Sequence, residues 1–121
     1  MRVRVLVPVV AFAALAGCSS NPPAPIPSPP PGAVVVTAAQ TRFLESRVEA
    51  PAGAAFTIYF ENRDSADHNV HVWDAAGASV MAGQIFGGPA ARTENVPALT
   101  AGTYRVTCDI HPEMTAELLV H

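Results

Sequence analysis

The feature that most constrains the fold is a series of short segments in which apolar and polar residues alternate. The clearest is residues 56–61, which read FTIYFE. The same period of two recurs over residues 68–73, 104–108 and 114–121. Alternation of this kind is typical of strands with one buried face, and no segment shows a convincing 3.6-residue helical period. Because turn signals such as Pro51-Ala52-Gly53 separate these runs, the sequence predicts an all-β Greek-key antiparallel β-sandwich over residues 33–121.

Two stretches of this domain carry weaker or more specific signals. Residues 74–100 are rich in Gly and Ala and weakly patterned, so we expect a long connection there, and the pattern leaves a helix open. Gly102-Thr103-Tyr104 stands just before an inward-facing segment. A tyrosine at that place suits the tyrosine corner of Greek-key sandwiches.

A proline-rich segment sets the N-terminal boundary of the domain. Residues 18–32 contain seven prolines. Proline lacks the backbone N–H that helices and strand ladders need, and it favours the extended polyproline II conformation. We therefore expect residues 18–32 to form a linker of about 3.1 Å per residue. An SH3-type ligand motif is the alternative.

The first seventeen residues resemble the signal peptide of bacterial lipoproteins. A short cationic start at Arg2 and Arg4 is followed by an apolar run over residues 5–16, shorter than the roughly 20 residues of a membrane span. The run ends in Leu15-Ala16-Gly17-Cys18, similar to a lipobox, in which Cys18 becomes the lipidated N-terminus. An ordinary signal peptide with a chance cysteine is the alternative. We expect residues 1–17 to be removed and the protein to be a membrane-anchored, extracytoplasmic lipoprotein, at the periplasmic face of a bacterial membrane.

Charge and cysteine content exclude several classes of protein. The chain has seven Arg, no Lys and ten acidic residues, for a net charge of −3, which excludes a basic nucleic-acid binder. Removal of Arg2 and Arg4 would leave five Arg against ten acids, or −5. Two cysteines cannot build a disulfide scaffold. With Cys18 lipidated, Cys108 would be unpaired, and a lone thiol outside the cytoplasm persists when it is buried or ligated.

The residues with the most distinctive chemistry lie between Cys108 and Met114. Cys108 ends one predicted strand and Met114 begins the next, so His111 lies on the loop between them. His68 begins another inward-facing strand and can reach the same end of the sandwich. Two His, one Cys and a weak axial Met form the ligand set of a blue-copper electron-transfer site. Zinc is the competitor, but Met is not among its usual ligands, and a two-copper centre would need a second cysteine in this loop.

On these residues the sequence resembles the cupredoxins, the small blue-copper proteins, over residues 34–121. The resemblance rests on Asp67-His68-Asn69-Val70, on Ala101-Gly102-Thr103-Tyr104 and on a Cys-x2-His-x2-Met loop similar in length to that of amicyanins. It implies that His68, Cys108 and His111 are close ligands of one copper ion, with Met114 as the axial ligand. It also implies that Asn69 ties the two ligand-bearing segments together by hydrogen bonds.

The function implied by this resemblance is that of a copper-binding, one-electron carrier rather than an enzyme. The expected partners are redox proteins, such as a cytochrome, an oxidase or a reductase, and we expect a monomer. The exposed edge of His111 would be the electron port, with Pro112 and residues 83–89 forming the docking patch. Two alternatives stay open: a lipoprotein that stores copper or delivers it to a cuproenzyme, and a non-metal β-sandwich interaction module.

Three further side chains are expected to take no part in the site. By strand alternation His71 points away from His68, and we expect it at the surface. Trp73 is expected to pack on the sheet surface rather than to relay electrons. His121 ends the alternating run over residues 114–121, and its parity also points outward.

Overall fold

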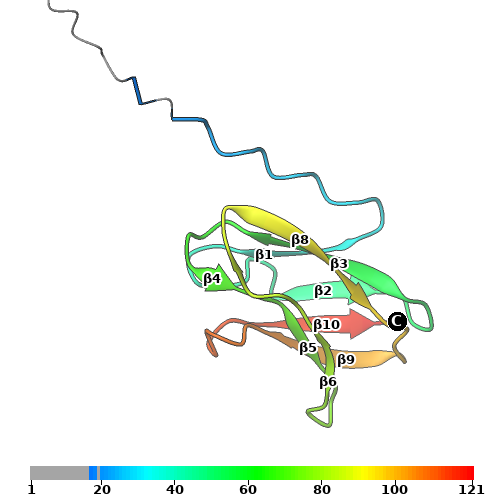
Figure 1. The fold of residues 1–121 in the computed structure, drawn as a ribbon. Helices are drawn as coiled ribbons and strands as arrows, with labels where there is room; N and C mark the ends of the chain where they lie inside the picture. Colours follow the sequence, from blue (N-terminus) through cyan, green and yellow to red (C-terminus); the bar gives the residue numbers. More distant parts are fainter. Residues whose placement is uncertain (1–16, 19) are drawn as a thin grey trace, which may run out of the picture.

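The computed structural model describes residues 17–18 and 20–121, so the predicted signal peptide lies outside the described residues except for Gly17. The described chain forms a β-domain preceded by an extended N-terminal segment (Figure 1). No helix in the described part of the chain is long and apolar enough to cross a membrane. The strands are β1 (Val34–Ala38), β2 (Arg47–Ala50), β3 (Phe56–Asn62), β4 (Asp67–His68), β5 (His71–Trp73), β6 (Ser79–Ala82), β7 (Phe86–Gly87), β8 (Ala90–Val96), β9 (Gly102–Thr107) and β10 (Thr115–Val120).

Two sheets pack as a sandwich, which confirms the predicted all-β architecture. One sheet has the order β1-β3-β8, and the other has the order β2-β10-β9-β5-β6. The short strands β4 and β7 pair with each other. Most pairs are antiparallel, but β1 and β3 are parallel, as are β10 and β2. The sequence pattern gave no indication of these two parallel pairs. Between β1 and β3 the chain crosses to the other sheet, where it forms β2, and then crosses back. Strand β3 therefore runs in the same direction as β1.

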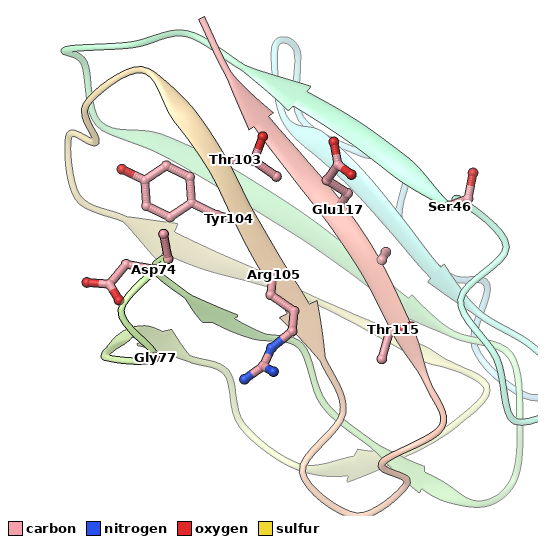
Figure 2. A pocket seen from close by; sticks show the side chains of 10 residues that line it. Ser46, Asp74, Gly77, Thr103, Tyr104, Arg105, Thr115 and Glu117 are labelled. Carbon is pink, nitrogen blue, oxygen red and sulfur yellow. The ribbon is translucent and has the colours of Figure 1, made fainter.

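The outer face of the five-stranded sheet carries a groove of about 650 Å³ (Figure 2). A row of paired residues crosses this face, with Trp73 on β5 opposite Arg105 on β9, and Glu117 on β10 opposite both Arg105 and Arg47 on β2. Arg47 and Glu117 form an ion pair of 2.9 Å. This face is therefore polar, while the opposite face of the same strands points into the core.

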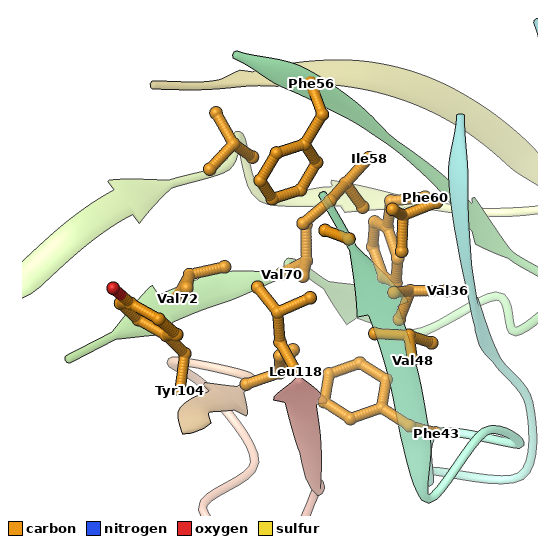
Figure 3. Close-up of a cluster of buried hydrophobic side chains, with 14 of the residues drawn as sticks. Val36, Phe43, Val48, Phe56, Ile58, Phe60, Val70, Val72, Tyr104 and Leu118 are labelled. Atoms are coloured by element: carbon orange, nitrogen blue, oxygen red, sulfur yellow. The ribbon is translucent and has the colours of Figure 1, made fainter. Parts of the chain in front are cut away.

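The core lies between the two sheets and is lined by the alternating residues that the sequence singles out (Figure 3). Phe60 is fully buried and packs edge-to-face against Phe43 and Phe86, with ring centroids 6.3 and 5.6 Å apart. The Tyr104 hydroxyl donates a 2.9 Å hydrogen bond to the carbonyl of Thr100, which is the expected tyrosine corner. Tyr104, Val106 and Cys108 are all buried, so the inward face predicted for residues 104–108 is correct.

Residues 74–100 form three strands, β6, β7 and β8, instead of one long connection. The expectation was wrong because β6 and β8 lie at sheet edges. Several residues of each are exposed or only partly buried. An edge strand pairs through its backbone and does not require an alternating apolar face, so its sequence pattern is weak.

Candidate metal centre

Three side chains that can bind a metal gather at one end of the sandwich. The ligand atoms of His68, Cys108 and His111 all lie within 4.8 Å of one another. The Cys108 Sγ lies 3.9 Å from Nδ1 of each histidine, and the two Nδ1 atoms are 3.0 Å apart. His68 and Cys108 are buried, with 0% and 3% of their surface exposed, whereas His111 is only partly buried. The structure thus brings together three of the four residues that the sequence proposes as ligands.

The orientation of His68 is fixed by a carboxylate that the sequence analysis did not single out. Nε2 of His68 lies 2.9 Å from Oδ2 of Asp64. A carboxylate at Nε2 holds the ring proton on that nitrogen, which leaves the lone pair of Nδ1 for a metal. The arrangement is a carboxylate–histidine pair of the kind that orients metal ligands.

Asp64 is itself held by two consecutive backbone N–H groups. Gln40 and Thr41 donate to its two carboxylate oxygens at 2.8 and 2.9 Å. Both residues have φ of 56°, the left-handed conformation that non-glycine residues seldom adopt. The Thr41 N–H lowers the pKa of the Asp64 carboxyl, burial opposes this, and the Gln40 N–H and His68 lower the pKa further. Asp64 is therefore an anion in a fixed position behind His68.

Asn69 connects the two segments that carry the candidate ligands. Its Oδ1 accepts the backbone N–H of Asp109 at 2.8 Å, and its Nδ2 donates to Oδ2 of Asp109 at 2.8 Å. The same Nδ2 donates to the carbonyl of Gly83 at 3.1 Å. A Cβ atom at Gly83 would stand 2.8 Å from the carbonyl oxygen of Val70, so this close approach needs glycine. Asn69 is 1% exposed, and these bonds satisfy its amide within the protein interior.

The loop from Cys108 to Met114 is closed by its own backbone. The N–H of Met114 donates to the carbonyl of His111 at 2.9 Å, and the N–H of Cys108 donates to the carbonyl of Met114 at 3.3 Å. These bonds form a tight turn that places His111 beside Cys108. Met114 is 1% exposed and belongs to the hydrophobic core.

The chemistry of the gathered donors fits a soft, redox-active metal ion. A first-row ion such as zinc lies about 2.0 Å from nitrogen and about 2.3 Å from thiolate sulfur, so donors 3 to 4 Å apart can share one ion. Two imidazoles and one thiolate in a three-coordinate arrangement are the close ligands of blue-copper sites. The carboxylate of Asp64 accepts from two backbone N–H groups and contacts Nε2 of His68, on the side of the ring away from the cluster. Two imidazoles and one thiolate are therefore the His and Cys donors that converge here.

One sequence-based expectation about this region was wrong. His71 was expected at the surface, but it is buried, with 8% of its surface exposed. Its Nδ1 lies 2.7 Å from Oδ1 of Asp109, and its Nε2 lies 2.7 Å from Oγ of Ser79. Alternation gave the correct side of the sheet for His71 but carried no information on the side chains that cover it. The sequence analysis missed Asp64 because its contact with His68 depends on the fold and belongs to no sequence motif.

Comparison with known proteins agrees with this geometry. A family model described as a cupredoxin-like domain matches residues 7–120. A search of curated proteins gave no match.

Solved structures of two proteins resemble the fold. A reduced amicyanin variant is 26% identical, covering 76% of this chain and 85% of that one, with a TM-score of 0.60. A Cu(I) form of another amicyanin variant is 26% identical, covering 74% and 83%, with a TM-score of 0.59. Reduced auracyanin from Roseiflexus castenholzii, at 16% identity, covers 74% and 97% with a TM-score of 0.66 and supports the fold alone. The sandwich, the cluster at its end and the family match together lead to one conclusion: the chain belongs to the family of cupredoxin-like domains.

Proposed function

We propose that this protein is an extracytoplasmic one-electron carrier that holds one copper ion through His68, Cys108 and His111, with Met114 as the axial ligand. The observation that carries the proposal is the convergence of two Nδ1 atoms and one Sγ within 4.8 Å at the end of a cupredoxin-like sandwich. A bound copper ion supplies the redox chemistry by alternating between Cu(I) and Cu(II). The copper(I) form of amicyanin among the structural relatives supports this choice of metal.

The surrounding residues limit how far the ligands can move. His68 is held by Asp64, and the two ligand segments are joined through Asn69 and Asp109. Soft thiolate and thioether donors suit Cu(I), and imidazole suits both oxidation states. A rigid ligand set changes little between the two states, so little rearrangement opposes the transfer of an electron.

His111 is the ligand through which we expect a partner to exchange electrons. It is partly exposed, and its neighbours Ile110 and Pro112 are exposed. Ile110 is 44% exposed and Ile85, on the segment that precedes β7, is 46% exposed. Small apolar contact areas of this kind suit the short-lived encounters of redox proteins. Asp109 and Glu113 are exposed beside this surface, so it favours a basic partner whose association slows as salt increases.

We further propose that Cys18 is a lipid attachment site and that residues 18–32 separate the domain from the membrane. Cys18 is an exposed free cysteine, and residues 20–30 have no regular secondary structure. The sequence before Cys18 supports an export signal. In cells, Cys18→Ala should move the protein from the membrane to the soluble fraction. Retention of this variant in the membrane fraction would contradict lipidation at Cys18.

A visible absorption spectrum tests the copper assignment. Copper(II) added to the purified metal-free protein should produce an intense thiolate-to-copper band, and Cys108→Ala should abolish it while Cys18→Ala leaves it unchanged. A reversible one-electron wave in voltammetry would support a carrier. A coloured protein without such a wave would favour copper storage or delivery, and a colourless protein that ignores copper would favour a non-metal interaction module.

A further inference from the structure

The proline-rich linker reverses its direction just before the domain begins. The N–H of Ala33 donates to the carbonyl of Pro30 at 3.1 Å, and Gly32 has a φ of 77°. Proline at the second position and glycine with positive φ at the third are typical of a type II turn. In Figure 1 the linker accordingly extends from this turn toward the end of the domain where β4 lies, and β1 runs toward the same end. Because β4 contains His68, this is the end that holds the metal centre.

The linker is also bound to the domain by a tyrosine on the outer face of the three-stranded sheet. Ile58 and Phe60 lie in the core, so Tyr59 between them points to the outer face of β3. Its hydroxyl donates a hydrogen bond to the carbonyl of Pro27. Tyr59 is only 4% exposed, and Ile26 is the one partly buried residue among the described residues of the linker. An aromatic side chain that binds a proline-rich segment is the usual basis of polyproline II recognition.

We propose that residues 26–32 form a strap on the three-stranded sheet, which shortens the linker and turns the metal end of the domain toward the membrane. The inference rests on the proposed function, because it needs a lipid at Cys18 and a redox metal at His68, Cys108 and His111. The partner that this arrangement fits is a redox protein embedded in the same membrane. The strap thus belongs to the domain, and only residues 18–25 form the free part of the linker.

The direction of β1 shows what the strap changes. Ala38, the last residue of β1, pairs with Asn62, so β1 runs toward the metal end. The Asn62 side chain donates to the carbonyl of Phe86, the residue that pairs with His68. A linker that continued straight back from Val34 would therefore leave the domain at the opposite end. The lipid would then hold the metal centre away from the membrane, and the turn and the bond to Tyr59 reverse this arrangement.

The strap also limits how far the domain can move from the membrane. At about 3.1 Å per residue, residues 18–32 would span about 45 Å in the polyproline II conformation, whereas residues 18–25 span about 25 Å. Tyr59 lies three residues before Asn62, which is about 10 Å along the strand from the metal end. A short linker attached this close to the metal end keeps His111 near the membrane surface.

The strap can be tested without a metal or a lipid. Nitroxide labels are placed on Ala24→Cys and Arg92→Cys in the metal-free full chain that carries Cys18→Ser and Cys108→Ser. Ala24 and Arg92 are exposed, and the Arg92 side chain lies over Phe86 rather than on the outer face. Electron paramagnetic resonance should give a narrow distribution of distances between the labels. A distribution as broad as that of an unfolded linker would overturn the strap.

Two glycines make a matched pair of variants for this measurement. Gly32 and Gly53 have φ of 77° and 75°, and a Cβ atom would meet nothing within 4 Å at either. Alanine is strained at such φ in both turns, but only Gly32→Ala should broaden the distribution. Tyr59→Phe removes the hydroxyl alone and should broaden it as well. Equal widths in Gly32→Ala, Tyr59→Phe and Gly53→Ala would contradict the strap.

The orientation is tested with the lipidated, copper-loaded protein on phosphatidylcholine vesicles. A flash excites a ruthenium polypyridyl complex attached to a lipid headgroup, which gives one electron to Cu(II) and is oxidised by one electron. Loss of the visible copper band measures the rate. Gly32→Ala should be several-fold slower than the unmodified protein and Gly53→Ala, whereas the same complex free in solution should reduce all three equally.

The outcomes separate the strap from the proposed function. Equal rates from the lipid-bound complex in Gly32→Ala and Gly53→Ala would overturn the orientation and leave the carrier and the anchor in place. An unmodified protein that does not sediment with the vesicles would overturn the lipid anchor, and with it the role of the strap at the membrane. An unmodified protein with no copper band would overturn the carrier, whereas the distances between the nitroxide labels would still report on the strap.

Discussion

The two segments that carry the imidazoles, residues 64–70 and residues 108–114, differ in burial and in what fixes them. In the first, His68 has no exposed surface and its Nε2 contacts the anchored Asp64 carboxylate. In the second, His111 is partly exposed, and the bonds that hold it belong to its own short loop. One segment therefore sets the geometry of the centre, and the other opens it to solvent. Rigidity and access are separate properties here, supplied by separate parts of the chain.

The strongest test of this comparison removes each imidazole in turn. His111→Gly should open the centre to solvent, so added imidazole should occupy the space and restore the visible copper band. His68→Gly should lose the band without recovery, because residue 68 lies where free imidazole cannot enter from solvent. Absorption titration with copper(II), with and without imidazole, measures both. Recovery of both variants, or of His68→Gly alone, would contradict the assigned roles of the two segments.

The next test concerns the anchor behind His68. Asp64→Asn should weaken copper binding by about 10- to 100-fold, the usual effect of losing a partner that orients a ligand. Competition with a chelator of known affinity measures the change. Asp67→Asn is the matched control, because Asp67 is an exposed carboxylate adjacent to His68 in sequence. If the two variants weakened binding equally, the effect of Asp64 would be one of net charge rather than of ligand orientation.

The same comparison explains which parts of the site the sequence could predict. The loop from Cys108 to Met114 is a local feature, so its spacing and the strand alternation around it indicate where the donors lie. The contact between Asp64 and His68 depends on the N–H groups of Gln40 and Thr41, more than twenty positions upstream. Non-glycine residues give no signal in the sequence that they will adopt positive φ. That contact could not be predicted without the fold.

Two other differences have a similar cause. Alternation places His71 on the outer face of its strand, which is correct, but the cover over it comes from Asp109 and Ser79 on other segments. The edge strands β6 and β8 were missed because pairing at a sheet edge depends on the backbone rather than on an apolar pattern. Sequence patterns report local periodicity, and both of these features depend on non-local contacts.

A third prediction asks whether the two segments form one unit without a metal. Asn69→Ala removes the bonds to Asp109 and Gly83 and leaves the N–H of Asp109 without its partner, which should lower the free energy of unfolding by about 1–3 kcal/mol. Urea unfolding of the metal-free protein measures this value. Asn95→Ala, at an exposed position of β8, should change it by less than about 0.5 kcal/mol. Equal stabilities would mean that only the metal holds the segments together.

The smallest expected effect is a change in the reduction potential. It distinguishes a residue that adjusts the potential of the centre from a residue that is needed to bind copper. Met114→Gln should keep the visible band, because the two imidazoles and the thiolate remain, but it should lower the reduction potential, since a harder oxygen donor favours Cu(II). Voltammetry measures the shift, and Met81→Gln, on the edge strand β6, should leave the potential unchanged. An unchanged potential in Met114→Gln would exclude Met114 as the axial ligand. A lowered potential with full copper binding would instead show that residues 108–114 set the potential, while residues 64–70 hold the metal in place.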